Sequence, residues 1–525
     1  MAADQHYDVV IIGTGAGGGT LGHRLATNGV KVLWLERGPF LPRERDNWQT
    51  DAVFVCGKYL AQELWYDRHG NEFQPEVNYY VGGNTKFYGA ALFRLRPEDF
   101  GELRHHGGIS PAWPISYDDL EPFYTQAEHL YLVHGQHGED PTEGPTSKQY
   151  AYPPVSHEPR IQQLSDDLEK LGLHPFHLPI GVNLQEVEPG RAANQPVYPL
   201  RPGRWLPVRA ERKVGLAGHL CGSGAVPRQR HVDHRRQCAA LGDQRLRAQR
   251  HWSCHTFGGR IRDHIHRRHR RGRLWRGELG RPAAEVSRRP PPGRARQQLR
   301  RCRPALHAAQ QRRLMAVSGE PNPTRFQKTL AMNDWYLGAD DWDYPLGGIQ
   351  MLGKSDDEEI HAQAPRWAGK ISPDLPFEVL AHHAVDIWLC GEDLPQPDNR
   401  VTVDAEGAIH LTIDEKNNIE GVKRLRHKLD GMLSHLGMHE HHLLDRSLYL
   451  HKSMPIGATA HQAGTVRFGT DPASSALDVN CKAHDVDNLY VVDTSFFPSI
   501  GAVNPSLTAI ANALRVGDHI TERLR

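Results

Sequence analysis

Cysteine is scarce in this sequence, and no run of apolar residues is long. The 525 residues include seven cysteines, too few for the disulfide-dense scaffold of a small secreted domain. The longest apolar runs fall far short of the roughly 18 residues that span a membrane. The first residues, 1–6, are polar and unlike a secretory signal. We therefore expect a cytoplasmic protein without a membrane span.

The overall composition excludes a disordered or fibrous chain. Apolar residues make up 38% and charged residues 24%, which is enough apolar material for a large core. At about 150 residues per unit the length suggests roughly three to four units, although cofactor enzymes of this size often have two interleaved domains. The net charge of +1 offers no general attraction for a polyanion, but this average hides one strongly basic segment.

The basic segment is residues 201–313. It contains 29 Arg and 1 Lys against 6 acidic residues, with no Tyr, no Asn and a single Phe, Phe257. The other 412 residues carry 33 basic and 56 acidic side chains. The segment shows no sustained apolar period that would indicate a buried face of a strand or helix. High net charge with few bulky apolar groups predicts poor folding, and we expect residues 201–313 to be irregular.

Three explanations of this segment compete. Arginine clusters such as residues 267–271 could bind nucleic acid, but no nucleic-acid-binding motif is present and stacking aromatics are few. Its cysteines and histidines could bind a metal, but their spacing matches no CxxC-type site. The explanation that we favour is translation out of frame from a GC-rich gene. Arg, Pro, Gly, Ala and His are enriched, and codons for residues 205–209, moved by one base, can read Gly-Phe-Pro-Cys.

A glycine-rich turn near the N-terminus lies between two predicted strands. The run DVVII at residues 8–12 predicts one buried strand, and VKVLWL at 30–35 predicts another. The segment between them predicts a helix that ends at Asn28-Gly29. Its inner face would consist of Leu21, Leu25 and Ala26.

This β-α-β unit carries the GxGxxG pattern of dinucleotide binding. Gly13 permits the tight turn, Gly15 lets the backbone approach a diphosphate, and Gly18 lets helix and strand pack closely. Glu36 follows the second strand, 21 residues after Gly15, where a carboxylate can bind ribose hydroxyls. A glycine-rich surface turn would not explain Glu36, so we expect a bound dinucleotide. FAD and NAD are both compatible with this unit.

Five further motifs stand on the two sides of the basic segment: YVGGNTKFYGAAL at 80–92, WPISYDDLEPFY at 113–124, HQAGTVRFG at 461–469, NLYVVDTSFFP at 488–498 and NPSLT at 504–508. These motifs resemble those of the glucose–methanol–choline (GMC) oxidoreductases. The order and spacing of these motifs follow that family over residues 5–200 and 314–525, about four fifths of the chain. The resemblance fails across 201–313, where the family has the middle strands of its flavin domain.

The resemblance implies FAD as the cofactor and oxidation of an alcohol carbon by hydride transfer to flavin N5. His461 matches the family's catalytic histidine, which acts as general base for the hydroxyl proton, and Asn504 matches its partner. Phe87 and Tyr88 stand where some relatives have a histidine bound to FAD, so we expect non-covalent FAD. No metal is expected. With the glycine pattern, the cofactor-binding residues would be Gly13, Gly15, Gly18, Glu36, Gly83, Asn84, Asp493, Pro505, Ser506 and Leu507.

The residues assigned by resemblance also have simpler interpretations. A histidine at a strand end is usually structural, and Asn504 before Pro505 could be a turn residue or a helix cap. Asp493, which we expect to follow a strand at 489–492, could cap the next turn.

Two other groups of residues could form sites. His435, His439 and His442 could bind a metal, but no HExxH pattern is present and a solvated helix end is more typical. The aromatic residues Trp335, Tyr336, Trp342 and Tyr344 could stack on a sugar, although such residues more often pack in a core.

The expected fold is α/β: an FAD-binding Rossmann-like domain with a substrate domain of antiparallel sheet plus helices. FAD-binding segments are expected at 1–110 and 456–525, a helical part of the substrate domain at 111–200, and its main part at 314–455. Within these segments, the pattern predicts a strand at 379–389, a hairpin at 401–409, an amphipathic helix at 422–436 and a last helix at 508–520.

The function that we predict is FAD-dependent oxidation of a small-molecule alcohol, with sugars among the candidate substrates. The sequence leaves open whether oxygen, a quinone or a protein accepts the electrons. The alternatives are an inactive or misfolded chain of GMC origin and, less favoured, a nucleic-acid-binding protein that uses the Arg-rich segment.

Overall fold

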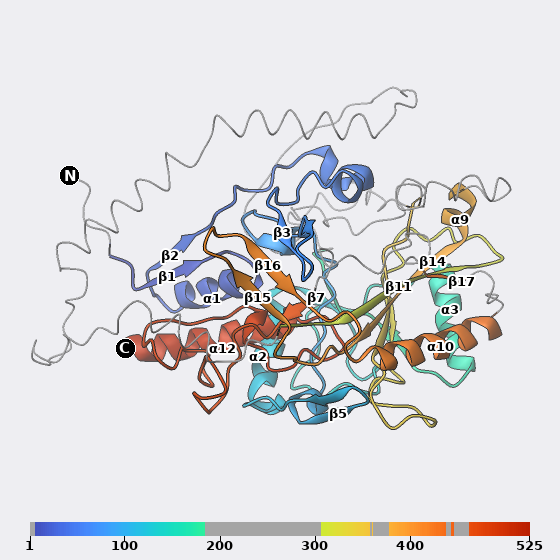
Figure 1. Ribbon diagram of the computed structural model, residues 1–525. Helices are drawn as coiled ribbons and strands as arrows, with labels where there is room; N and C mark the ends of the chain where they lie inside the picture. Colours follow the sequence, from blue (N-terminus) through green and yellow to red (C-terminus); the bar gives the residue numbers. More distant parts are fainter. Residues whose placement is uncertain (1–5, 184–305, 357–359, 361–376, 437–442, 446–460) are drawn as a thin grey trace, which may run out of the picture. The chain divides into compact units, whose positions relative to one another are not determined.

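The computed structural model describes residues 6–183, 306–356, 360, 377–436, 443–445 and 461–525 (Figure 1). Two compact units divide the chain, one formed by residues 1–218 and 295–525 and the other by residues 219–294. The second unit lies outside the described residues, so every element discussed below belongs to the first.

The N-terminal β-α-β unit forms as the sequence predicts. Strands β1 (Val9–Ile12) and β2 (Val32–Leu35) are parallel neighbours, and helix α1 (Ala16–Thr27) joins them. Asn28 caps the helix, and Gly29 has φ +83°, a left-handed conformation that glycine adopts at low cost.

Helix α1 packs on the C-terminal helix α12 (Ser506–Leu524), which also packs on α2 (Tyr117–Leu130) (Figure 1). Leu21 and Leu25 of α1 are buried as predicted, but Ala26 is exposed. Each residue turns the helix by about 100°, which carries Ala26 beyond the face that meets the core. Helix α12 is longer at both ends than predicted. None of the helices in the described ranges is long and apolar enough to cross a membrane.

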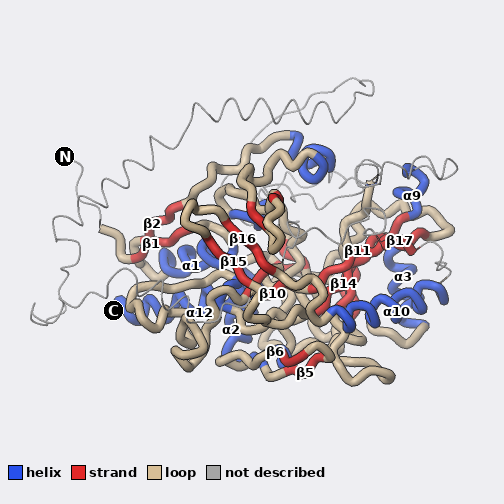
Figure 2. The backbone as a smooth tube through the Cα atoms, viewed as in Figure 1, coloured by secondary structure: helices blue, strands red, loops and turns tan. Residues whose placement is uncertain are grey.

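A six-stranded antiparallel sheet forms the predicted substrate domain (Figure 2). The strand order is β17-β11-β14-β13-β12-β8, and all neighbours are antiparallel. One face of the sheet packs through apolar side chains on α3 (Pro159–Lys170) and α10 (Ile419–His435). The strands are β8 (Pro175–His177), β11 (Gln310–Val317), β12 (Leu330–Met332), β13 (Gly348–Met351), β14 (Ala384–Gly391) and β17 (Leu443–Asp445).

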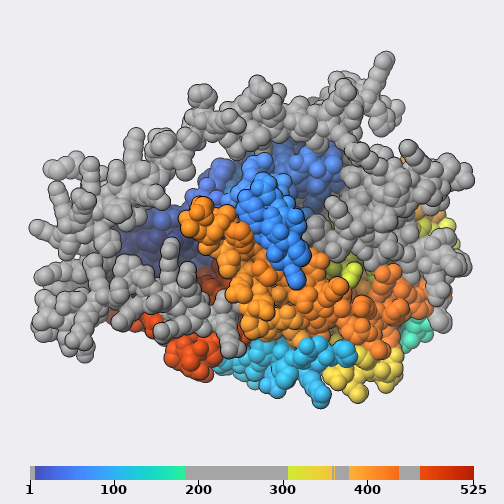
Figure 3. All heavy atoms as spheres, viewed as in Figure 1, coloured from blue at the N-terminus to red at the C-terminus, as the bar shows by residue number. Residues whose placement is uncertain are grey.

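Smaller elements complete the described part of the chain. The predicted hairpin is present as an antiparallel pair, β15 with β16, and β16 also pairs in parallel with β3. In Figure 3 the orange atoms of this hairpin region lie against the blue atoms of β3 and β4. The remaining strands and short helical turns are β3 (Trp65–Tyr66), β4 (Glu72–Phe73), β5 (Leu103–His105), β6 (Gly108–Ser110), β7 (Val133–His134), β9 (Ile180–Gly181), β10 (His307–Ala308), β15 (Arg400–Val403), β16 (Ile409–Thr412), β18 (Gln462–Ala463), η1 (Arg45–Trp48), η2 (Asp51–Val55), η3 (Gly83–Lys86), η4 (Pro97–Phe100) and η8 (Thr494–Phe496).

Two predicted strands are wrong. The run at 379–389 begins in a helix, α9 (Phe377–His383), before β14 starts. Leu380 and Ala381 are buried there, and an unbroken apolar run does not distinguish a buried helical turn from a strand. The segment 489–492 forms only an isolated bridge, between Tyr490 and Lys482. Its backbone hydrogen-bonds to the short segment 481–483, because the Leu489 carbonyl accepts from the Ala483 N–H and the Val491 N–H donates to the Cys481 carbonyl.

The expectation that residues 201–313 are irregular is wrong at the C-terminal end of that segment. Residues 307–308 form β10, and β11 begins at Gln310 and pairs with β14 along its whole length. Backbone pairing tolerates polar side chains when a long partner strand is present, and Leu306 and Ala308 are buried. Residues 201–305 lie outside the described part.

Candidate functional site

The turn after β1 leaves open space above two of its glycines. Gly13 has φ +90°, which favours glycine. A Cβ atom on Gly13 or Gly15 would meet no atom within 4 Å, whereas one on Gly18 would collide with the Gly13 carbonyl and lie 3.2 Å from Ile11 Cγ2. Gly18 therefore lets the helix close on the strand, and Gly15 borders open space at the N-terminus of α1. Backbone N–H groups at such an end stabilise an anion, so a diphosphate fits this turn.

Glu36 lies at the edge of the same turn. Its carboxylate accepts hydrogen bonds from the backbone and hydroxyl of Thr14, and from the backbone N–H groups of Arg37 and Gly38. Burial acts to raise the pKa of Glu36, but these hydrogen bonds outweigh it and lower the pKa. The side chain is thus an ionised acceptor, and a ribose hydroxyl could replace the hydroxyl of Thr14.

A second glycine loop lies against the first. The Gly82 N–H donates to Thr14 Oγ1 at 2.9 Å. A Cβ on Gly83 would lie 3.6 Å from Gly15 Cα, so the two loops nearly touch. Asn84 stabilises this loop, because its Oδ1 accepts a hydrogen bond from the Asn78 N–H at 2.8 Å. The structure therefore brings together the glycine turn, Glu36 and the predicted flavin-side loop.

Asp493 reaches the same end of α1 through its backbone. A Cβ on Gly17 would collide with the Val492 carbonyl and lie 3.2 Å from Asp493 N. The Asp493 carboxylate is exposed and accepts from the Ser495 N–H at 2.9 Å, capping η8. The capping role is thus present, and the cofactor role stays a prediction.

The predicted catalytic pair meets in the core. Asn504 Nδ2 lies 3.2 Å from His461 Nε2, although the residues are 43 positions apart. His461 directly precedes β18, and its carbonyl accepts from the Ala309 N–H at 3.0 Å. Asn504 precedes α12, whose N-cap is Pro505. His461 and Asn504 are 9% and 7% exposed, so they form a buried polar pair.

The start of α12 carries the other predicted residues of this segment. Ser506 is the first residue of the helix, and Leu507 is fully buried in the main apolar core. The Leu507 side chain therefore packs, and only the backbone of Leu507 could meet a cofactor.

Gln350 belongs to the site and was not predicted. Its Nε2 donates to Asn504 Oδ1 at 2.9 Å and lies 3.8 Å from Cys390 Sγ. Gln350 is 4% exposed in β13. The only signal in the sequence is a lone amide in the short apolar strand GIQM, and that signal is weak because many strands contain one polar residue.

The surroundings of His461 keep its ring neutral. Trp388 stacks on the imidazole with ring centroids 5.4 Å apart and 17° between the planes. Burial, and secondarily the charge of Lys328, lower the pKa of His461 to about 3. Burial likewise lowers the pKa of Lys328 to about 7. A neutral imidazole can accept a proton.

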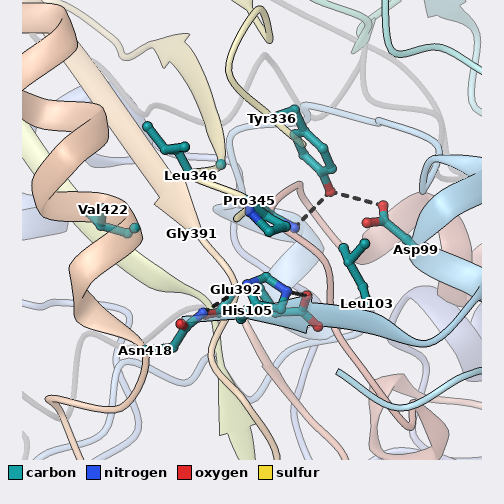
Figure 4. A pocket seen from close by; sticks show the side chains of 13 residues that line it. Asp99, Leu103, His105, Tyr336, Pro345, Leu346, Gly391, Glu392, Asn418 and Val422 are labelled. Carbon is teal, nitrogen blue, oxygen red and sulfur yellow. Dashed lines mark hydrogen bonds and ion pairs between the residues drawn. The ribbon is translucent and has the colours of Figure 1, made fainter. Parts of the chain in front are cut away.

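Buried acceptors fix the backbone that leads to Asn504 (Figure 4). Glu392 Oε1 lies 3.3 Å from the N–H groups of both Ile500 and Gly501, and the Tyr336 hydroxyl accepts from Ala502 N–H at 2.9 Å. The same hydroxyl donates to Asp99 Oδ2 at 2.9 Å. Three consecutive N–H groups are thus held by side chains from other segments.

The loop before Asn504 also requires a glycine. Gly501 has φ +63°, and a Cβ there would lie 2.8 Å from Leu95 Cδ2. The position therefore combines a left-handed backbone with close packing, both of which favour glycine.

The aromatic residues considered for sugar stacking do not form one platform. Tyr336 is 2% exposed and belongs to the core. The Arg424 guanidinium covers Trp342 at 3.6 Å from the ring centroid, and Tyr344 lies beside Trp342. Trp335 packs against the core of the sheet.

The histidines considered as metal ligands fall mostly outside the described part of the chain. His439 and His442 lie outside the described residues, as does the side chain of His435. Within the described ranges, no group of three His, Cys, Asp or Glu residues could hold a metal ion.

Comparisons with known proteins agree with the geometry. A family model described as GMC oxidoreductase matches residues 336–513. The chain is 28% identical over 561 residues to 6'''-hydroxyparomomycin C oxidase of Streptomyces lividus, covering 99% of this chain and 92% of that protein. It is 27% identical over 547 residues to paromamine 6'-oxidase of Streptomyces fradiae, covering 98% and 91%.

A solved structure shares the fold over nearly the whole chain. Pyridoxine 4-oxidase from Mesorbium loti superposes with a TM-score of 0.51 at 15% identity, covering 98% of this chain and 99% of that one. The described residues thus have the fold of an FAD-binding domain combined with a substrate domain. Over residues 336–513 the chain matches the GMC oxidoreductase family, and the two Streptomyces relatives extend the similarity over almost the whole chain.

Proposed function

We propose that this protein oxidises a small-molecule alcohol with FAD, with His461 as the general base and Asn504 as its partner. The observation that carries the proposal is the buried contact between His461 and Asn504, made by two segments far apart in the sequence. A neutral imidazole beside a neutral amide suits removal of a hydroxyl proton, because neither group repels the developing negative charge on the oxygen.

His461 and Asn504 would have different roles at the substrate hydroxyl. His461 Nε2 would take the hydroxyl proton. Because the one lone pair of Nε2 faces Asn504 Nδ2 in this structure, the substrate hydroxyl would take the place of that contact, and Asn504 Nδ2 would then donate to the substrate oxygen. Burial excludes water around both groups, which strengthens these interactions and orients the alcohol. FAD, when bound, supplies the acceptor for the hydride that leaves the alcohol carbon.

The chain's own residues would hold FAD without a covalent bond. The open turn at Gly13 and Gly15 would take the diphosphate, and Glu36 would take the ribose. His105, a histidine near the flavin-side loop in sequence, has both ring nitrogens engaged, by Glu392 at 3.0 Å and Asn418 at 3.1 Å. Such a histidine is a poor candidate for covalent attachment.

The relatives suggest which alcohols to test first. Two of them are named as oxidases of hydroxyparomomycin C and of paromamine. We therefore propose amino-sugar and sugar alcohols as the first substrates for a panel, together with simple primary alcohols. Oxygen and artificial acceptors should be compared in the same assay, because the residues described here do not discriminate between them.

The test is anaerobic flavin reduction by the best alcohol of this panel. His461→Ala should keep FAD but slow reduction by about 10²- to 10⁴-fold, the usual contribution of a general base. His174→Ala is a matched control, since His174 is exposed and pairs only with Asp334 among the described residues. Unchanged reduction in His461→Ala would remove His461 from the proposed role.

A further inference from the structure

Gln350 holds the amide of Asn504 from the side opposite His461. It lies in β13, between β12 and β14, and directly opposite Trp388 in the register of the sheet. Its Nε2 donates to Asn504 Oδ1 at 2.9 Å. Gln350 is 4% exposed and its backbone is paired on both sides, so the side chain has little room to move, and its Nε2 also lies 3.8 Å from Cys390 Sγ.

The orientation of the Asn504 amide determines what faces the imidazole. With Oδ1 accepting from Gln350, the amide presents Nδ2 to His461 Nε2 at 3.2 Å. An amide nitrogen only donates hydrogen bonds. His461 Nε2 must therefore carry a lone pair, and the single proton of the neutral ring must sit on Nδ1.

Among the described residues, no second hydrogen bond competes for control of the ring. The Nδ1 atom of His461 is buried and has no hydrogen-bond partner among the described residues. A hydrogen bond at one nitrogen sets which nitrogen of a histidine is protonated. Here the contact at Nε2, made by Asn504, is the one that can do so.

We propose that Gln350 is a positioning residue: by fixing the amide of Asn504, it holds His461 in the tautomer whose lone pair is on Nε2. The inference rests on the proposed function for its consequence. In the reaction the substrate O–H bond breaks, the proton forms a bond to Nε2, and the electron pair of the C–H bond leaves with the hydride for the bound cofactor. Gln350 itself touches no reacting atom.

The test reads the tautomer directly, by ¹⁵N NMR of the full chain with ¹⁵N-labelled histidine. The His461 resonances are identified by their loss in His461→Gln. In the wild type we expect a protonated Nδ1 and an unprotonated Nε2. An Nε2–H signal for His461 in the wild type would overturn the proposal without any need for a variant at Gln350.

Variants then test whether Gln350 is the cause. Gln350→Met keeps the length of the side chain but cannot donate, so the single tautomer should give way to a mixture. Gln311→Met is the matched control, since Gln311 lies on the same face of the sheet, opposite Cys390, and its amide has no partner among the described residues. A wild-type tautomer in Gln350→Met would also overturn the proposal.

Kinetics separate this inference from the proposed function. If both hold, Gln350→Met retains FAD and reduces it more slowly, by up to about a hundredfold, as a misplaced reacting group does. If only the tautomer changes and reduction is unaffected by both Gln350→Met and His461→Ala, the positioning role holds and the general-base role fails. If His461→Ala is slow while Gln350→Met keeps the tautomer and rate, the general-base role holds and the positioning role fails.

Discussion

The indole of Trp388 lies nearly parallel to the imidazole of His461, with 5.4 Å between ring centroids. Trp388 is 3% exposed and is the register partner of Gln350 on the next strand. One strand pair therefore supplies both the apolar wall against His461 and the amide that reaches Asn504. The wall excludes water from the ring, which is the main reason for the lowered pKa of His461.

Removal of this wall should therefore raise the pKa of His461 toward the ordinary value. Trp388→Ala would admit water and also destabilise the fold by about 3–5 kcal/mol, the usual cost of a buried aromatic side chain. NMR titration of His461 measures the pKa, and urea denaturation measures the stability. Trp388→Phe, which keeps an aromatic ring over the imidazole, is the control. An unaltered His461 pKa in Trp388→Ala would contradict this account of the burial.

The lowered pKa of His461 predicts loss of stability in acid. The folded value is about 3, against about 6.5 for a free histidine. Between these values the unfolded chain binds the extra proton, so His461 costs stability as the pH falls from about 6.5 toward 3, by about 1.4 kcal/mol per unit at most. Lys328, with a pKa of about 7, is already largely protonated in that range.

Urea denaturation at pH 7, 6 and 5 tests this acid sensitivity. The difference in unfolding free energy between the wild type and His461→Gln should move in favour of the variant as the pH falls, because glutamine does not titrate. A constant difference across these pH values would show that His461 has an ordinary pKa in the folded protein.

Gly15 and Gly18 should respond differently to the same substitution. Gly15→Ala places a methyl group in open space, with no atom within 4 Å, so the protein should fold normally but lose affinity for FAD. Gly18→Ala drives a methyl group into the Gly13 carbonyl and should lower the melting temperature. Thermal denaturation of the apoprotein and flavin content after purification separate the two effects. Equal melting temperatures would argue against the close packing at Gly18.

Local backbone signals made the first part of the fold predictable from the sequence. The glycines of the turn and the Asn28-Gly29 helix end act within a few residues, and β1, α1 and β2 follow from them. The prediction of a strand over all of residues 379–389 is wrong because an apolar run of that kind is equally compatible with a buried helical turn and with a strand.

The site was predicted only where a motif marked it. His461 and Asn504 stand in motifs that resemble a known family, and the structure brings them together. Gln350 and Trp388 stand in none, and Gln350 meets Asn504 from 154 positions away. Contacts of that kind depend on the register of the sheet, which no local pattern in this sequence specifies.

Tyr336 should be important for stability through its hydroxyl. Tyr336→Phe removes the partner of the Ala502 N–H and of Asp99, leaving buried polar groups unmatched, at about 1–3 kcal/mol. Urea denaturation measures the loss. Tyr344→Phe is the control, because the Tyr344 side chain is half-buried and its hydroxyl makes no hydrogen bond within the described residues. Equal stability of the two variants would mean that the hydroxyl of Tyr336 does not hold the loop before Asn504.

The exposed apolar side chains of β1 are relevant to the out-of-frame explanation of the Arg-rich segment. Val10 and Ile12 are 53% and 85% exposed, and β1 and β2 form a sheet of two strands among the described residues. Parallel strands are normally covered on both faces. If residues 201–313 are read out of frame, as we propose, the chain as written lacks side chains suited to cover this face.

Comparison of the written chain with a frame-corrected chain tests that proposal. Sequencing the gene should reveal compensating insertions or deletions near codons 197 and 313. The corrected chain should purify with FAD, whereas the written chain should bind little FAD and more of a dye that reports exposed apolar surface. Ile12→Thr in the written chain should reduce dye binding without restoring FAD, since it removes apolar surface but supplies no missing strand. Equal, stoichiometric FAD in both chains would refute the expectation that the written chain binds FAD weakly, because a segment without the family's middle strands would then suffice.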